Sequence, residues 1–82
     1  LSRSIRYAEE LIKKGERDVA NICAGAKVLY TGVNSAKLDY LSIVDYDTFE
    51  PAEELVTGGK YFILVACRIG RTRLIDNILT NV

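Results

Sequence analysis

Residues 2–14 alternate apolar and charged positions with the spacing of an α-helix. Apolar side chains recur at positions 5, 8, 11 and 12, and charged side chains of both signs occupy most positions between them. This spacing gathers the apolar residues on one face, so it predicts an amphipathic helix that ends at Gly15. Because the charges on the other face are mixed in sign, we interpret that face as a solvated surface rather than a binding site.

A second helix is predicted from Arg17 or Asp18 to about Tyr30. Its apolar stripe again follows helical spacing and comprises Val19, Ile22, Cys23, Ala26 and Leu29. Gly25 weakens a helix interior by about 1 kcal/mol relative to Ala, which indicates a close approach to the first helix at this point. The short connection between the helices predicts an antiparallel pair, and the turn-forming residues 31–35 separate this pair from the rest of the chain.

The pattern then changes to that of β-strands. Residues 38–46 are rich in β-branched and aromatic side chains, and residues 60–69 are apolar nearly throughout, which is typical of a central strand. A tight turn at 70–72 leads into a third strand at 73–79. Residues 47–59 contain the only Pro and a Gly-Gly pair and form a loop, with a short edge segment near Phe49 as an alternative. The predicted fold is an α+β domain in the order α-α-β-β-β, with two N-terminal helices packed on one face of a small, mainly antiparallel three-stranded sheet.

The chain is too short to cover both faces of this sheet. In the first strand Leu41 and Ile43 share one face, and Tyr40 and Val44 share the other. Two short helices cover one face only, yet the apolar strand 60–69 calls for burial on both. The sequence therefore predicts that the second face meets another domain or another copy of the chain, and that the chain has no pocket of its own.

Composition narrows the function classes. The chain has 82 residues and a mass of 9.1 kDa, which fits a single domain over residues 1–82. Its 11 basic residues balance 11 acidic ones, which argues against a nucleic-acid partner because such domains are usually basic. No apolar run reaches the roughly 18 residues that a bilayer crossing requires, so no membrane partner is expected. Leu1, in place of an initiator Met, indicates a piece of a longer chain.

The missing residue types also limit the chemistry. The sequence has no His, so imidazole-based acid–base catalysis and imidazole zinc sites are excluded. Its two cysteines, Cys23 and Cys67, are flanked by apolar or small residues. We interpret them as reduced, buried thiols without a catalytic role, which fits a cytoplasmic protein. No catalytic residue and no metal ligand is predicted.

The segment Gly70-Arg71-Thr72-Arg73 is the one cluster that resembles an anion site. Arg71 and Arg73 lie beside a glycine, and guanidinium groups bind phosphate and carboxylate well. The segment lacks the Lys and the second Gly of a phosphate-binding P-loop, so a solvated basic turn is the alternative. Arg71 and Arg73 are therefore the candidate anion-facing residues.

Asp76 interrupts the apolar third strand. A buried carboxylate needs hydrogen-bond donors, and we expect Arg68 or Arg73 to supply them. We interpret Asp76 as a structural residue and not as a catalytic one.

The end of the chain carries its most specific pattern. Small and aliphatic residues over 64–69 precede Gly-x-Thr-Arg-Leu-Ile-Asp-Asn over 70–77. This pattern resembles the C-terminal signature of the pantoate–β-alanine ligases, also called pantothenate synthetases. Residues 38–45 and the following Thr-Phe-Glu-Pro at 48–51 are similar to the preceding strand of that family. The resemblance extends over essentially the whole chain.

The resemblance implies a function for the parent protein. The family condenses pantoate with β-alanine through a pantoyl-adenylate, using ATP and Mg²⁺. Its N-terminal nucleotide-binding domain holds the adenylating histidine motif, the pantoate pocket and the dimer contacts, and none of these motifs occurs here. By resemblance, residues 1–82 are the C-terminal lid domain, their partner is the N-terminal domain, and the fragment alone binds no cofactor and is inactive.

Two other interpretations stay open. A free-standing interaction module would self-associate through its sheet, and an upstream histidine motif would distinguish the ligase lid from such a module. An anion or nucleotide binder that uses residues 70–73 would bind ATP directly.

Overall fold

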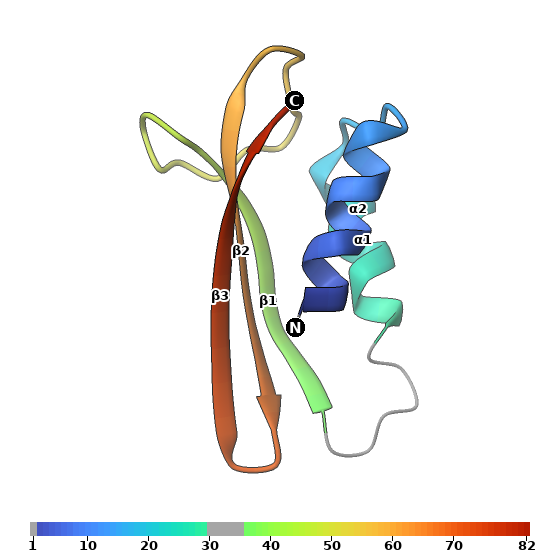
Figure 1. The fold of residues 1–82 in the computed structure, drawn as a ribbon, viewed down its shortest axis with the longest axis vertical. Helices are drawn as coiled ribbons and strands as arrows, with labels where there is room; N and C mark the ends of the chain where they lie inside the picture. Colours follow the sequence, from blue (N-terminus) through green and yellow to red (C-terminus); the bar gives the residue numbers. More distant parts are fainter. Residues whose placement is uncertain (1, 30–35) are drawn as a thin grey trace.

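The computed structural model describes residues 2–29 and 36–82, and it contains two helices followed by three strands. The elements are α1 (Ser2–Lys13), α2 (Val19–Val28), β1 (Ala36–Asp45), β2 (Lys60–Ile69) and β3 (Thr72–Asn81). This order confirms the α-α-β-β-β prediction (Figure 1). The connection predicted at residues 31–35 lies outside the described residues.

The predicted element boundaries differ from the observed ones by one to a few residues. The second helix begins at Val19 because Asp18 is its N-cap, with extended backbone angles and a side chain that accepts a hydrogen bond from the Ala20 amide. The first strand starts at Ala36 and ends at Asp45. The Asp45 carboxylate accepts a hydrogen bond from the Asp47 amide in the turn that follows. The third strand is longer than predicted and covers Thr72–Asn81.

The two helices form a close antiparallel pair joined by a tight turn (Figure 1). Gly15 ends the first helix with φ at 105°, a value that favours glycine. Its amide donates to the Ile12 carbonyl at 3.1 Å, and the Glu16 amide donates to the Leu11 carbonyl at 2.9 Å. These bonds satisfy carbonyl groups of the last helical turn, which confirms that Gly15 terminates the first helix, two residues after Lys13.

Gly25 allows the helices to approach each other, as predicted. A Cβ atom built at this position would lie 2.7 Å from Cζ of Tyr7 in α1, which is closer than real Cβ contacts. The glycine therefore makes room for the Tyr7 ring, and any larger residue at position 25 would collide with it.

The three strands form one antiparallel sheet with β2 in the centre. The β2–β3 hairpin closes through a two-residue turn in which Gly70 has φ at 59°, and Ile69 pairs with Thr72. On the other side of β2, the register shifts between Leu38 and Tyr40, so Asp39 forms a β-bulge.

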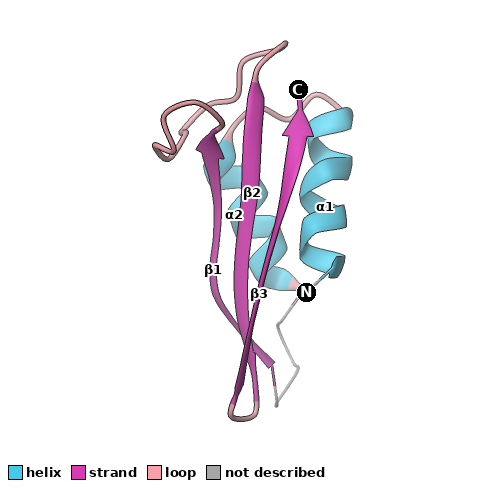
Figure 2. Cartoon of the chain, turned by 60° about the vertical axis from the view of Figure 1, so that its left-hand side comes forward, coloured by secondary structure: helices cyan, strands magenta, loops and turns pink. Residues whose placement is uncertain are grey.

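Both helices cover the same face of this sheet (Figure 2). The core between the two layers is formed by Ile5, Ala8, Ile12, Val19, Ile22, Ile43, Leu55, Tyr61, Ile63 and Val65. In β2 the buried side chains Tyr61, Ile63 and Val65 alternate with the half-buried Phe62 and Leu64. This alternation shows which face of the central strand is covered.

The segment between β1 and β2 is fastened to the turn between the helices. The Val19 amide donates to the Glu53 carbonyl at 3.0 Å, and the Leu55 amide donates to the Arg17 carbonyl at 2.8 Å. The Arg17 guanidinium also donates to the carbonyl of Ile12 at 2.8 Å. Arg17 thus links the end of α1 to this segment.

Within the described residues, no helix is long and apolar enough to cross a membrane.

Candidate functional site

The face of the sheet opposite the helices, which we call the open face, is an apolar surface that the helices leave uncovered. Its strand residues are Tyr40, Ser42, Val44, Phe62, Leu64, Ala66, Ile75, Asn77 and Leu79. Ile75 is 62% exposed, Leu79 is 43% exposed and Tyr40 is 39% exposed. The helices therefore leave this face of the sheet uncovered, and it is exposed in part. Apolar side chains of β1 and β3 reach solvent there and Phe62 and Leu64 of β2 are half-buried, whereas Val44 and Ala66 are buried.

Three rings form an aromatic cluster, Tyr46, Phe49 and Phe62, at one end of the open face. The Phe62 ring of β2 stacks against Tyr46, with centroids 5.4 Å apart, and meets the edge of Phe49 at 5.5 Å. The Lys60 ammonium lies 5.6 Å from the Tyr46 centroid. The loop that follows β1 carries two of these rings and projects on the side away from the helices (Figure 1).

Phe49 has an unusual backbone for a large side chain. Its φ is 60°, and it is the one non-glycine residue with positive φ among residues 2–29 and 36–82. The Asp45 carboxylate accepts from the amides of Asp47 at 2.8 Å and Thr48 at 3.1 Å, and the Phe49 amide donates to the Asp45 carbonyl at 2.9 Å. These bonds hold the turn in a conformation that costs about 1–2 kcal/mol for a residue other than glycine.

The opposite end of the open face carries the arginines. Arg73 Nε lies 3.2 Å from Oδ2 of Asp39, and Arg68 Nη2 lies 3.9 Å from the same oxygen. The Arg73 guanidinium also lies over the Tyr40 ring, 5.9 Å from its centroid. Arg71 is exposed at the hairpin turn and forms no ion pair with any described residue. The structure therefore separates the two anion-facing candidates, since Arg73 is partly neutralised and Arg71 is not.

The predicted partners of Asp76 are wrong. Arg68 and Arg73 pair with Asp39 instead, and Asp76 accepts a hydrogen bond from the Asn77 amide at 2.8 Å. The carboxylate needs no buried donor because it is exposed on β3, which is an edge strand of the sheet. It borders a shallow hollow of about 200 Å³ between α1 and β3.

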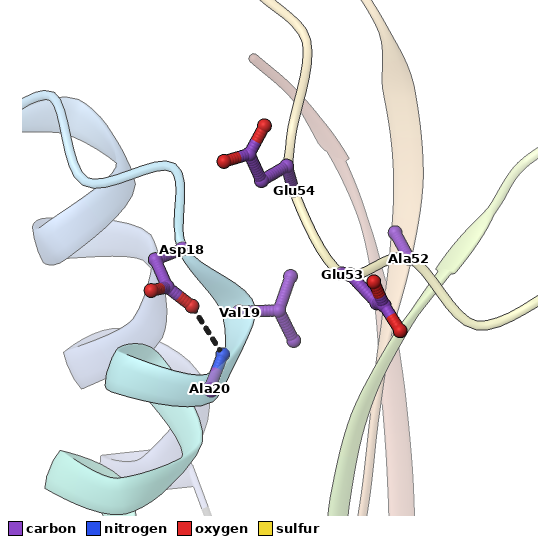
Figure 3. A pocket seen from close by; sticks show the side chains of 6 residues that line it. All are labelled: Asp18, Val19, Ala20, Ala52, Glu53 and Glu54. Atoms are coloured by element: carbon purple, nitrogen blue, oxygen red, sulfur yellow. Dashed lines mark hydrogen bonds between the residues drawn. The ribbon is translucent and has the colours of Figure 1, made fainter.

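A larger hollow of about 510 Å³ lies where α2 begins (Figure 3). It is lined by Asp18, Val19, Ala20, Ala52, Glu53 and Glu54. Three of these residues carry carboxylates, so the hollow repels phosphate and carboxylate ligands. In the part of the chain that the structure describes, no group of three or more His, Cys, Asp or Glu residues could hold a metal ion.

The two cysteines are free thiols in different surroundings. Cys67 is buried, whereas Cys23 is half-buried and its Sγ donates to the Leu41 carbonyl at 3.3 Å. Burial raises the pKa of the Cys23 thiol, and the nearby charge of Lys27 opposes this effect. Since a raised pKa disfavours the thiolate, Cys23 is not an activated nucleophile.

Two residues that shape these surfaces were not predicted. Strict alternation in β1 gives no sign of the bulge at Asp39, so the sequence does not predict that its carboxylate meets two arginines. The positive φ of Phe49 is likewise not predictable from the sequence. The one available signal was a large aromatic residue at the end of a turn rich in Asp and Thr, where glycine or Asn is usual.

Comparison with known proteins identifies the family. A model of the family described as pantoate-beta-alanine ligase matches residues 1–79. The chain belongs to this family. It is 42% identical over 82 residues to the pantothenate synthetase of Caldicellulosiruptor saccharolyticus, and this match covers 100% of the chain and 28% of that protein. It is 47% identical over 77 residues to the pantothenate synthetase of Chlorobaculum tepidum, with 94% of the chain and 27% of that protein covered.

A solved structure agrees with this assignment. The pantothenate synthetase of Thermus thermophilus superposes with a TM-score of 0.74 at 31% identity, over 95% of the chain and 27% of that structure. The resemblance seen in the sequence is thus confirmed. The chain spans little more than a quarter of the length of these relatives.

Proposed function

We propose that this chain is the C-terminal lid domain of an ATP-dependent ligase that condenses pantoate with β-alanine, and that its open face docks on the nucleotide-binding part of the same ligase. The open face carries this proposal, because it exposes apolar side chains of all three strands while the other face of the sheet is covered by helices. Membership in the pantoate-beta-alanine ligase family points to the reaction. The match to 28% of a relative's length points to the remainder of such a ligase as the partner.

The reaction centre belongs to the remainder of the ligase. The larger hollow is lined by three carboxylates, which repel the phosphates of ATP, and among residues 2–29 and 36–82 no group of three or more His, Cys, Asp or Glu could hold Mg²⁺. The chain has no His and no activated thiol to serve as a base or nucleophile. We therefore expect the isolated chain to be inactive as a ligase.

Closure of the lid keeps water away from the activated carboxyl group of pantoate until the amine of β-alanine attacks it. The hairpin end of the open face contributes charge to this closed state. Arg71 is free of intramolecular ion pairs with described residues and is available to an anionic group across the interface, whereas Arg73 is held by Asp39.

Recombination of two separate parts tests this proposal. The 82-residue chain is mixed with the remaining part of the ligase, and pantothenate formation is measured at increasing concentrations of the chain. We expect ligation that rises with added chain and saturates, and none from the chain alone. Binding of the two parts without any gain in ligation would contradict a closing role.

The alternative is a free-standing module that self-associates through the same open face and the unpaired edge of β3. Sedimentation of the isolated chain distinguishes the two. A dimer that persists when the remaining part of the ligase is added favours the module, whereas a dimer that dissociates in favour of the mixed complex supports the lid.

A further inference from the structure

The loop after β1 displays an aromatic ring on a strained backbone. Phe49 is 65% exposed and has φ at 60°. Large side chains rarely adopt this conformation, and strained residues persist where the surrounding structure holds them in place, often at functional sites. Here the hydrogen bonds to Asp45 provide that support. Burial does not account for an aromatic residue at this position, since most of the ring faces solvent.

The ring stands on a rigid base. Phe49 meets the edge of Phe62, which lies on the central strand, and Tyr46 stacks on the same ring. Aromatic side chains, Phe included, provide large contact areas and are enriched in the buried cores of protein interfaces. The exposed Val28 and Val56 belong to no such ring cluster.

We propose that the aromatic cluster anchors the open face on the remainder of the ligase, and that the Phe49 ring is the principal contact. This inference rests on the proposed function. It commits to the remainder of the ligase as the occupant, because a covalently tethered domain experiences an effective concentration near the millimolar range and docks through a small patch. Three partly exposed rings, each of which buries at most about 150–250 Å², fall short of the roughly 800 Å² per partner that separate chains need.

The anchor determines how long the lid remains closed. Without the Phe49 ring, the lid opens more often and water reaches the activated pantoate. Water then attacks the carboxyl carbon in place of the amine, the bond from that carbon to the phosphate oxygen of AMP breaks, and pantoate and AMP leave. ATP is consumed without formation of pantothenate, so the ratio of pantothenate to AMP measures lid closure.

The experiment uses the intact ligase that contains this domain. Variants Phe49→Ala, Phe49→Gly and Phe49→Tyr are compared with wild type and with Val28→Ala, which alters an exposed apolar residue on α2, on the other side of the sheet. Pantothenate and AMP are quantified in the same reactions. We expect the ratio to fall at least about fivefold in Phe49→Ala and Phe49→Gly, and to remain near the wild-type value in Phe49→Tyr and Val28→Ala.

The two truncations separate the ring from the backbone. Phe49→Gly relieves the positive φ and Phe49→Ala keeps it, so a loss caused by strain or stability would differ between them. Equal losses support the anchor. A loss in Phe49→Ala alone, a similar loss in Val28→Ala, or unchanged ratios in all variants would overturn it.

A ligase that lacks the whole domain serves as reference. If that enzyme retains full coupling, the proposed lid function fails, and if it is uncoupled while the Phe49 variants are not, only the anchor fails.

Discussion

Substitution of Gly25 by Ala should destabilise the chain, even though Ala is the better helix former. The new Cβ atom would lie 2.7 Å from Cζ and 2.8 Å from Cε1 of Tyr7, and closer still to the Tyr7 hydroxyl oxygen. Since the ring lies between two packed helices, either Tyr7 must leave its position or α1 and α2 must separate.

The size of this effect follows from two opposing terms. An Ala in the helix interior gains about 1 kcal/mol over Gly, whereas forcing an extra methyl group into a packed contact costs about 1–3 kcal/mol. We expect a net loss of about 1 kcal/mol, which lowers the melting temperature of a domain of this size by about 4–8 °C.

Urea unfolding of single and double variants measures both terms. In a Tyr7→Ala background the collision is absent, so Gly25→Ala should stabilise the chain by about 1 kcal/mol. Tyr7→Phe is the matched control, since it keeps the two clashing ring carbons and should not reverse the sign. If Gly25→Ala stabilises the chain equally in all three backgrounds, the proposed packing of Tyr7 on Gly25 is refuted.

Two further predictions concern stability. Asp18→Ala removes the N-cap of α2 and should lower the free energy of unfolding by about 1 kcal/mol in urea titrations, whereas Asp18→Ser, which keeps a capping oxygen, should lose much less. Burial raises the pKa of the Cys23 thiol above its ordinary value of 9.0, so the folded chain retains this proton after the unfolded chain has lost it. The contribution of Cys23 is therefore complete below the unfolded pKa and declines as pH rises through the folded pKa. Cys23→Ala should unfold with a weaker alkaline pH dependence than wild type, and identical dependences would contradict this assignment.

Periodicity and turn chemistry were sufficient to predict the elements. The change from helical to alternating spacing after residue 37 located the first strand, and Gly70 located the hairpin that joins the second and third strands. The apolar run at 60–69 identified the central strand, which pairs with β1 and β3 although the helices cover only one of its faces.

The side-chain partners were not predictable to the same extent. The need of a buried carboxylate for donors predicted Arg68 or Arg73 as the partner of Asp76, but a bulge at Asp39 brings the Asp39 carboxylate to both arginines instead. A bulge adds one residue to one strand and so reverses the alternation on one side of it. The backbone angle of Phe49 depends on the hydrogen bonds of its turn, which periodicity does not encode.

The central claim is that the open face meets the remainder of the ligase. Hydroxyl-radical labelling of side chains, read by mass spectrometry in the isolated chain and in the intact ligase, tests it most directly. We predict that labelling of Tyr40, Phe49 and Ile75 falls several-fold in the intact enzyme while that of Val28 on α2 stays the same. Equal labelling of the open face in both proteins would contradict the account.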